Sequence, residues 1–248
     1  MTYAPLQAMW VTPRGHKAVM DFREDTNDFN TITSALPEDE YRLRDYQVQG
    51  IAWDIGAHIG SVTIALLLDN PALRVVAVEP IEFNARLLWC NAFHNAVLDR
   101  TVVVEAAAGP PGMATTHLHH GFHGSEIAEH HAFIGNTSIG NTGPVDTWRL
   151  SSSYESTPVP VVDFEALVGR GGGFPAFIKI DCEGDEYSFL SAPGVADVPV
   201  ILGEWHNIPY GGRERSQQGD LVALLPNHHV EFSGPVDGPG GFVAVRRG

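Results

Sequence analysis

Two carboxylates and a histidine late in the chain are of the residue types that move protons or bind metal ions. Asp181 follows the apolar run "FIKI", Glu204 ends the apolar run "VPVILGE", and His206 comes two residues later. Because Mg²⁺ prefers oxygen ligands, Asp181 and Glu204 form a candidate metal pair. Imidazole has an ordinary pKa of about 6.5, so His206, with Asp181, is a candidate for catalysis. Alternatively, Asp181 only contacts a substrate, Glu204 pairs with a basic residue and His206 is structural.

A glycine loop precedes these residues in the chain. "DIGAHIG", from Asp54 to Gly60, follows an apolar run and opens a segment of helical spacing. Gly56 permits a tight turn and the close approach of a ligand, and Gly60 permits close packing of the helix. His58 occupies the place of the second glycine in the dinucleotide pattern, which disfavours a pyrophosphate. We therefore assign Asp54, Gly56, Ala57 and Gly60 to a different cofactor site.

The next acid along the chain has the spacing of a ribose ligand. Glu79 ends the apolar run "LRVVAVE", 25 residues after Asp54. A carboxylate there can accept hydrogen bonds from both ribose hydroxyls. An acid-glycine loop followed by a ribose acid is the pattern of S-adenosylmethionine (SAM) binding. Ala106 and Ala107 end the third apolar run, and Ala107 is assigned to the adenine. The alternatives are that the glycines only form a turn, that Glu79 is a solvated acid and that the two alanines serve ordinary packing.

Apolar runs alternate with segments of helical spacing, which predicts a mostly parallel α/β sheet with helices on both faces. We expect strands at 17–23, 50–54, 73–80, 101–109, 112–120, 176–184, 198–207, 228–234 and 240–247. We expect helices at 28–36, 37–46, 61–70, 82–95 and 185–192. The last two strands form an antiparallel hairpin, and ligands bind at the carboxyl ends of the parallel strands.

The same pattern predicts one domain over 1–248, with an N-terminal extension or cap at 1–46 and an added hairpin and lid at 112–150. Lys179 lies inside an expected strand and either places a charge beneath the site or reaches solvent from an edge strand. The acids at 183, 185 and 186 favour a helix N-terminus.

Composition narrows the classes of partner. The 248 residues carry a formal net charge of −15 and show no basic patch, so no nucleic-acid partner is expected. No run of about 18 apolar residues occurs, so no membrane span is expected. The N-terminal residues do not have the pattern of a signal peptide, and Cys90 and Cys182 form no disulfide framework. We expect a cytoplasmic protein and leave a homodimer open.

Five short motifs in the right order carry a resemblance to a known family. They are "REDTND" at 23–28, "DIGAHIG" at 54–60, "EP" at 79–80 followed by Asn84, "KIDCEGDE" at 179–186 and "EWH" at 204–206. The chain resembles the FkbM family of SAM-dependent methyltransferases. In the same order, the family's patterns are R-x-G-T-S-D, D-x-G-A-N-x-G, E-P followed by N, K-x-D-x-E-G-x-E and E-x-H. Asp25, Asn27 and His58 depart from these patterns, and the first two leave the role of the early motif open.

The resemblance implies a class I methyltransferase fold, SAM as cofactor and methyl transfer to an oxygen. It also adds Thr26 and Asn84 to the cofactor residues. The implied acceptor is a small-molecule glycoside, such as a macrolide-type sugar or a methylated bacterial mannoside. A neutral sugar hydroxyl needs a general base or a metal ion such as Mg²⁺ to become a nucleophile.

Six of the twelve histidines lie within residues 116–131, "THLHHGFHGSEIAEHH". His117 and His119 share one face of an expected strand and His120 lies on the other, so the six histidines do not all converge on one metal ion. We expect a lid and acceptor wall here. "HGSE" resembles the polar glycine-serine segment of the family, which makes His123 a catalytic candidate, with His120, and Ser125 a cofactor candidate. The alternatives are a non-catalytic metal-binding protein, an amino-methyltransferase using "NIPY" at 207–210 and a nicotinamide oxidoreductase.

Overall fold

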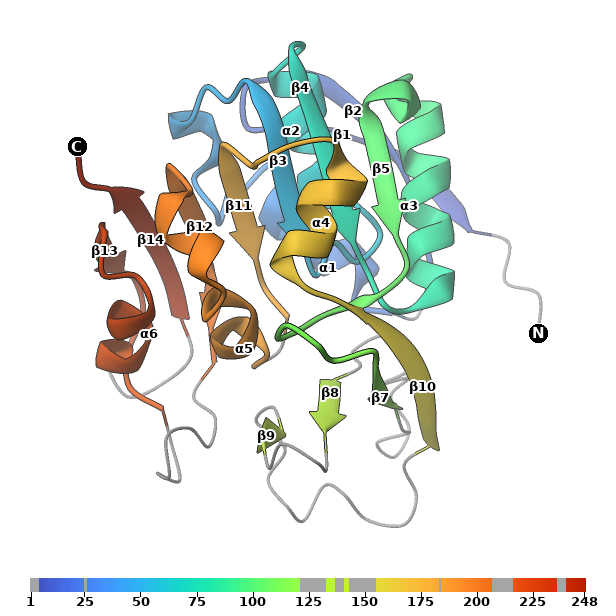
Figure 1. Ribbon diagram of the computed structural model, residues 1–248. Helices are drawn as coiled ribbons and strands as arrows, with labels where there is room; N and C mark the ends of the chain where they lie inside the picture. The colour runs from blue at the N-terminus through green and yellow to red at the C-terminus, as the bar shows by residue number, and fades with distance from the viewer. Residues whose placement is uncertain are drawn as a thin grey trace.

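The central sheet of the molecule has, among the described residues, seven strands in the order β13-β14-β12-β11-β3-β4-β5 (Figure 1). The computed structural model describes residues 5–24, 26–120, 133–136, 141–142, 155–182, 184–206, 216–235 and 240–248. The parallel strands are β3 (Gly50–Ile55), β4 (Leu73–Val78), β5 (Thr101–Val104), β11 (Phe177–Ile180) and β12 (Val200–Trp205). β14 (Gly240–Arg246) is antiparallel to β12 and to β13 (His228–Phe232). The predicted fold class and its C-terminal hairpin are confirmed.

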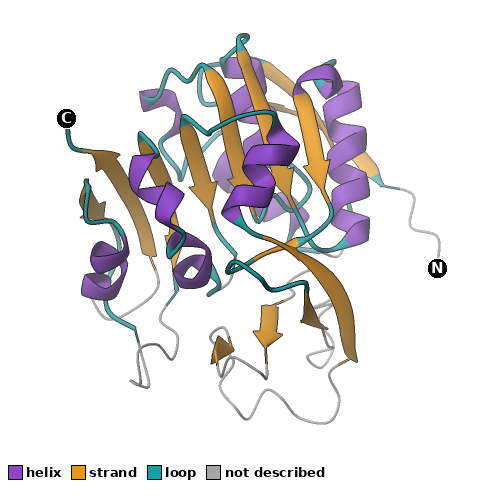
Figure 2. Ribbon diagram, in the orientation of Figure 1, coloured by secondary structure: helices purple, strands orange, loops and turns teal. Residues whose placement is uncertain are grey.

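Helices cover both faces of this sheet (Figure 2). One face packs against α1 (Asp28–Ala35), α2 (Ser61–Asp69) and α3 (Glu82–His94), and the other against α4 (Phe164–Gly171), α5 (Glu186–Leu190) and α6 (Gln218–Leu224). Neighbouring residues of β4 belong to opposite cores, Val75 to one and Val76 to the other. Burial on both faces explains why these strands are continuous apolar runs. No described helix is long and apolar enough to span a membrane.

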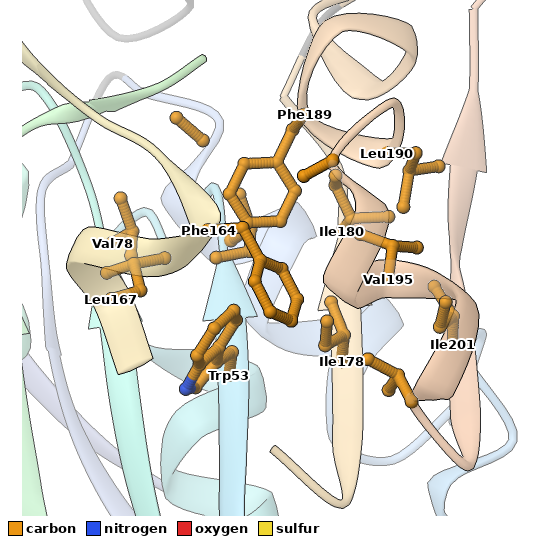
Figure 3. Packing of buried hydrophobic residues seen from close by; sticks show 14 of the residues in the cluster. Trp53, Val78, Phe164, Leu167, Ile178, Ile180, Phe189, Leu190, Val195 and Ile201 are labelled. Atoms are coloured by element: carbon orange, nitrogen blue, oxygen red, sulfur yellow. The ribbon is translucent and has the colours of Figure 1, made fainter. Parts of the chain in front are cut away.

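An aromatic cluster anchors α4 and α5 to the sheet (Figure 3). The ring of Trp53 in β3 lies 4.8 Å from that of Phe164 in an edge-to-face arrangement, and Phe189 packs against both. Trp53 and Phe189 are 0% exposed. Such pairs add roughly 1 kcal/mol each beyond the area that they bury. These aromatic contacts fix the strands that carry the polar residues described below.

A small N-terminal unit packs against the α2 and α3 side of the sheet. β1 (Leu6–Val11) pairs antiparallel with the predicted strand β2 (Lys17–Phe22), and β2 contacts α3. The helix expected at 37–46 is wrong: the segment holds only a 3-10 turn at Leu43–Asp45. Asp39 and Arg42 have φ values of 54° and 55°, and the Asp39 carboxylate accepts hydrogen bonds from the Leu43 amide and the Arg44 side chain. This local side-chain bonding replaces the helical ladder.

A second sheet lies beyond the carboxyl ends of the central strands (Figure 1). Its order is β6 (Ala107–Ala108), β10 (Glu155–Val162), β7 (Thr115–His120), β8 (Phe133–Asn136) and β9 (Asn141–Thr142). The single strand expected at 101–109 is therefore wrong. β5 ends at Val104, the Ala106 amide bonds back to the Val104 carbonyl at 2.9 Å, and the chain then joins the second sheet. The predicted strand at 112–120 is present as β7.

Candidate functional site

A cavity opens at the carboxyl ends of β3, β4 and β11, at the edge of the sheet where the sequence places the ligand. It holds about 900 Å³ of space, including the open solvent at its mouth. Its walls include the glycine loop, the acid after β4 and the acid after β11. The residues that line it are Thr31, Ala35, Glu40, Tyr41, Ile55, Gly56, Ala57, His58, Ser61, Val62, Val78, Glu79, Pro80, Ile81, Asn84, Ala106, Ala108, Lys179, Asp181 and Cys182.

The two glycines of the loop are required for different reasons. Gly56 has φ +74°, and a Cβ there would lie 1.8 Å from the Asp181 carbonyl oxygen. Gly60 has φ +92°, and a Cβ there would lie 2.7 Å from the Leu88 side chain of α3. Gly56 and Ala57 line the cavity, whereas Gly60 sets the packing of α2 against α3. His58 has φ +52°, a conformation in which His and Asn are enriched among non-glycine residues.

Asp54 lies behind the loop and does not line the cavity. Its carboxylate is 0% exposed, accepts a 2.6 Å hydrogen bond from Thr63 and lies 3.5 Å from the Lys179 ammonium. Lys179 also donates to the Gly56 carbonyl at 3.0 Å. Burial alone would lower the pKa of Lys179, but the carboxylates of Asp54, Asp181 and Glu40 outweigh it and the pKa is raised. Asp54 therefore acts on the cavity through Lys179 and the loop.

Glu79 presents a buried carboxylate to the cavity. Its oxygens accept hydrogen bonds from the His58 amide at 2.8 Å, the Ile81 amide at 3.0 Å and the Asn84 side chain at 3.2 Å. Burial raises the pKa of Glu79 even though these three donors oppose the shift. A carboxylate has about four acceptor positions, so these donors fix its orientation and leave room for another.

The early motif forms a buried layer behind Glu79. Arg23 donates to both oxygens of Asp28, at 2.8 and 2.7 Å, and to the Asn84 side chain at 2.8 Å. Asn84 in turn donates to Glu79. Burial alone would raise the pKa of Asp28, but the bonds from Arg23 and the charge of His58 lower it. Thr26 bonds to the Arg23 carbonyl and the Asp28 amide, so it shapes this turn and does not line the cavity.

The alanines after β5 lie differently from the expectation. Ala106 and Ala108 line the cavity. Ala107, which the sequence assigned to the adenine, is 0% exposed, packs with Val159 of β10 in a separate apolar cluster and is not among the residues that line the cavity. The cause is the pleat of β6, which turns alternate residues to opposite faces.

The late acids and the histidine come together beside this cavity. β11 and β12 are adjacent and parallel, which brings Asp181, Glu204 and His206 close enough that one ligand atom from each lies within 4.8 Å of the others. Asp181 accepts a 2.8 Å hydrogen bond from the Tyr41 hydroxyl. His123, Ser125 and the segment 207–210 lie outside the described residues.

A buried acid that the sequence did not single out holds the histidine. Glu186 is 0% exposed and accepts from the His206 Nδ1 at 2.8 Å. The same oxygen accepts from the backbone amides of Cys182 and Gly184, at 3.0 and 3.2 Å. With Nδ1 held, Nε2 is the ring atom on the side of Glu204, 3.9 Å from its carboxylate. The only signal in the sequence was the last acid of "KIDCEGDE".

A second cavity of about 790 Å³ shares Glu40 and Tyr41 with the first. Its wall continues along β12, β14 and β13 and includes Glu204, Glu231 and Phe232. Tyr41 thus stands between the two cavities, in the segment for which the sequence predicted a helix. Residues 40 and 41 were missed because their role depends on this irregular segment.

Comparison with known proteins identifies the family. A model of the methyltransferase FkbM domain matches residues 54–232. The chain belongs to the FkbM methyltransferase family. A search of curated proteins finds no match. Similar solved structures include an O-methyltransferase from Bacillus cereus in complex with SAH, at 18% identity and TM-score 0.47, covering 88% of each chain. They also include a precorrin-6y C5,15-methyltransferase from Geobacter metallireducens GS-15, at 14% identity and TM-score 0.43, covering 84% of this chain and 85% of that chain.

The motifs of this FkbM methyltransferase divide into residues that line the cavity and residues behind them. Gly56, Glu79, Asn84 and Asp181 line it. Arg23 lies behind them and is joined to Glu79 through Asn84. The departures in the early motif, at 25 and 27, leave the Arg23 and Asp28 pair in place.

The acid at the junction of the two cavities has an unusual pKa. Partial burial, the charge of Glu204 and the charge of Asp181 raise the pKa of Glu40 from 4.5 to about 7, although Lys179 opposes the shift. The folded protein therefore binds a proton at Glu40 that the unfolded chain has already released. The contribution of Glu40 to the free energy of unfolding therefore falls as the pH rises from 4.5 through 7.

Replacing Glu40 with glutamine is expected to stabilise the metal-free FkbM protein above pH 7 and to have no effect below pH 4. Solvent screening at the exposed rim limits the gain to about 1 kcal/mol. Urea unfolding in EDTA between pH 4 and pH 9 measures the difference. Glu165→Gln, at an exposed position in the first turn of α4, is the control. A gain that does not vary with pH would contradict the assigned cause.

Proposed function

We propose that this chain is a SAM-dependent O-methyltransferase that methylates a hydroxyl of a glycoside. The observation that supports it best is the Glu79 carboxylate, which lines the cavity beside the Gly56 loop and is held by three N–H donors. A carboxylate oriented in this way suits the ribose hydroxyls of SAM. The family match to a methyltransferase domain supports the same cofactor.

The cavity walls suit the rest of the cofactor. Ala106, Ala108 and Ile81 offer apolar surface for an adenine ring, and Gly56 allows the ligand to approach the backbone closely. SAM supplies an electrophilic methyl group on a sulfonium when it is bound. The protein must hold the acceptor oxygen in line with that group, about 3 Å away.

The acid end of the cavity is where we place the acceptor. Asp181 lines the first cavity and Glu204 the second, and Tyr41 lines both. Carboxylates and a tyrosine are suitable hydrogen-bond partners for sugar hydroxyls. His206 would take the proton of the hydroxyl that is methylated as a general base. Asp181 and Glu204 are the residues that would hold a metal ion, which would lower the pKa of that hydroxyl. The glycoside as acceptor follows from the family resemblance.

Isothermal titration with S-adenosylhomocysteine tests the cofactor. The wild-type chain is expected to bind it, and NAD is expected not to bind. Glu79→Gln should weaken binding by about 10- to 100-fold, because hydrogen bonds to a charged group contribute about 1.5–3 kcal/mol.

The control for this prediction is Glu82→Gln, three residues further on, whose side chain is 66% exposed and pairs along α3 with Arg86. Thermal unfolding of each variant separates loss of binding from loss of fold. Absence of wild-type binding at about 1 mM ligand, roughly −4 kcal/mol, would overturn the proposal.

A further inference from the structure

We propose that Asp181, Glu204 and His206 form a binding site for a divalent transition-metal ion, and that Glu186 is the positioning residue that orients His206 for it. The proposal deepens the proposed function, since the ion would lie where the acceptor hydroxyl is activated. Its metal affinity can nevertheless be measured without cofactor or acceptor. It also changes the expected metal from Mg²⁺ to an ion that accepts a nitrogen ligand.

The backbone brings the three side chains to one point. Asp181 follows β11, Glu204 lies in β12, and the two strands are paired in parallel with Ile180 opposite Gly203. Among the described residues, these three side chains are the one group of three or more His, Cys, Asp and Glu residues whose ligand atoms all lie within 4.8 Å of one another. Ligands on one ion, each about 2.1 Å from it, lie at most about 4 Å apart. Small side-chain rotations therefore complete the site.

Two of the three ligands are already oriented by outer partners. Glu186 accepts from His206 Nδ1 at 2.8 Å, and two backbone amides fix Glu186 in turn. This bond selects the tautomer in which Nε2 carries the lone pair. A carboxylate behind a ligating histidine is the common outer layer of metal sites. Tyr41 orients Asp181 in the same way, through its Oδ2.

The donor set determines the class of metal. Mg²⁺ binds oxygen ligands and keeps its waters, whereas imidazole suits transition metals. Two carboxylates with one imidazole fit Mn²⁺ or Fe²⁺ better than Mg²⁺. The charge balance agrees, because the Asp181 carboxylate lies beside that of Glu204, and the ammonium of Lys179, 3.9 Å from Asp181, also pairs with Asp54 at 3.5 Å. A divalent cation offsets that excess of carboxylates.

Calorimetric titration of the EDTA-dialysed full chain with MnCl₂ and with MgCl₂ tests the site. Wild type is expected to bind one Mn²⁺ at least about tenfold more tightly than Mg²⁺. Glu186→Gln should weaken Mn²⁺ binding by about 10- to 100-fold. Glu165→Gln, also a first-turn helix acid but exposed, should leave it unchanged. Equal Mn²⁺ affinity in Glu186→Gln and wild type would refute the positioning role.

A second measurement keeps the proposal testable if Glu186→Gln does not fold. Pulsed electron paramagnetic resonance of Mn²⁺-loaded wild type should show ¹⁴N coupling from one imidazole, and His206→Gln should remove it. No Mn²⁺ binding, coupling that persists in His206→Gln, or equal affinity for Mg²⁺ would overturn the site. S-adenosylhomocysteine binding by the same samples reports separately on the proposed function.

Discussion

Replacing Lys179 with methionine is expected to lower the free energy of unfolding by about 3–5 kcal/mol and to abolish cofactor binding. The substitution removes the cation from the buried carboxylate of Asp54 and the donor from the Gly56 carbonyl. Methionine keeps the length and apolar stem of the side chain, so packing changes little. A lone buried carboxylate is costly, and the loop loses the contact that fixes its carbonyl.

The other lysine of the chain provides the control. Lys17→Met removes the same charge from an exposed position in β2, and its unfolding free energy should stay within about 0.5 kcal/mol of wild type. Urea unfolding and titration with S-adenosylhomocysteine measure both effects. Because the pKa of Lys179 is raised, its contribution is complete at neutral pH and is lost only as the pH rises beyond 10.5. A Lys179→Met variant as stable as Lys17→Met would exclude this role.

Lys179 also shows what a sequence pattern leaves open. The apolar run "FIKI" identified a strand, and an edge strand would let its lysine reach solvent. In the sheet β11 lies between β12 and β3, so it is not an edge strand. The Lys179 ammonium lies 3.5 Å from the Asp54 carboxylate instead of in solvent. Strand order arises from tertiary packing, and hydrophobic periodicity carries no information about it.

The elements that the sequence predicted well are the long apolar strands and the helices between them. β3 and β4 are continuous apolar runs, α2 is buried on almost every side, and β3, α2, β4 and α3 each occur close to their expected bounds. The failures have local causes. Two left-handed residues interrupt the expected helix at 37–46, and β10 (Glu155–Val162) carries two prolines in an otherwise alternating strand. Proline removes a backbone donor and hides the strand pattern.

The residues of the site also differ in how far the sequence alone predicts their roles. Glu79 was recognisable because its spacing from the glycine loop is fixed by one helix and one strand, α2 and β4. The bond from Arg23 to Asn84 joins residues 61 positions apart, so only the folded chain reveals it. Glu186 had an ordinary explanation as a first-turn acid of a helix, which concealed its contact with His206. Partners from different elements cannot be read from either segment alone.

Gly56→Ala should have the second large effect, a loss of more than about 3 kcal/mol in the free energy of unfolding and at least tenfold weaker binding of S-adenosylhomocysteine. The positive φ of +74° accounts for roughly 1–2 kcal/mol of this loss. The rest comes from the new Cβ, which would lie 1.8 Å from the Asp181 carbonyl oxygen. The Asp181 oxygen is a backbone atom and a Cβ is fixed by the backbone that carries it. Neither atom can therefore rotate away, and the loop must separate from the end of β11.

Gly50→Ala isolates the steric contact from the backbone strain. Gly50 begins β3, the strand that leads into the glycine loop, has φ +83° and would place its Cβ in open space, with no atom within 4 Å. Its cost should therefore be about 1–2 kcal/mol, without a change in ligand affinity. The difference between the two variants measures the closeness of the glycine loop to the end of β11. If both variants lose stability equally and both bind ligand, the backbone conformation and not the contact with Asp181 requires the glycine.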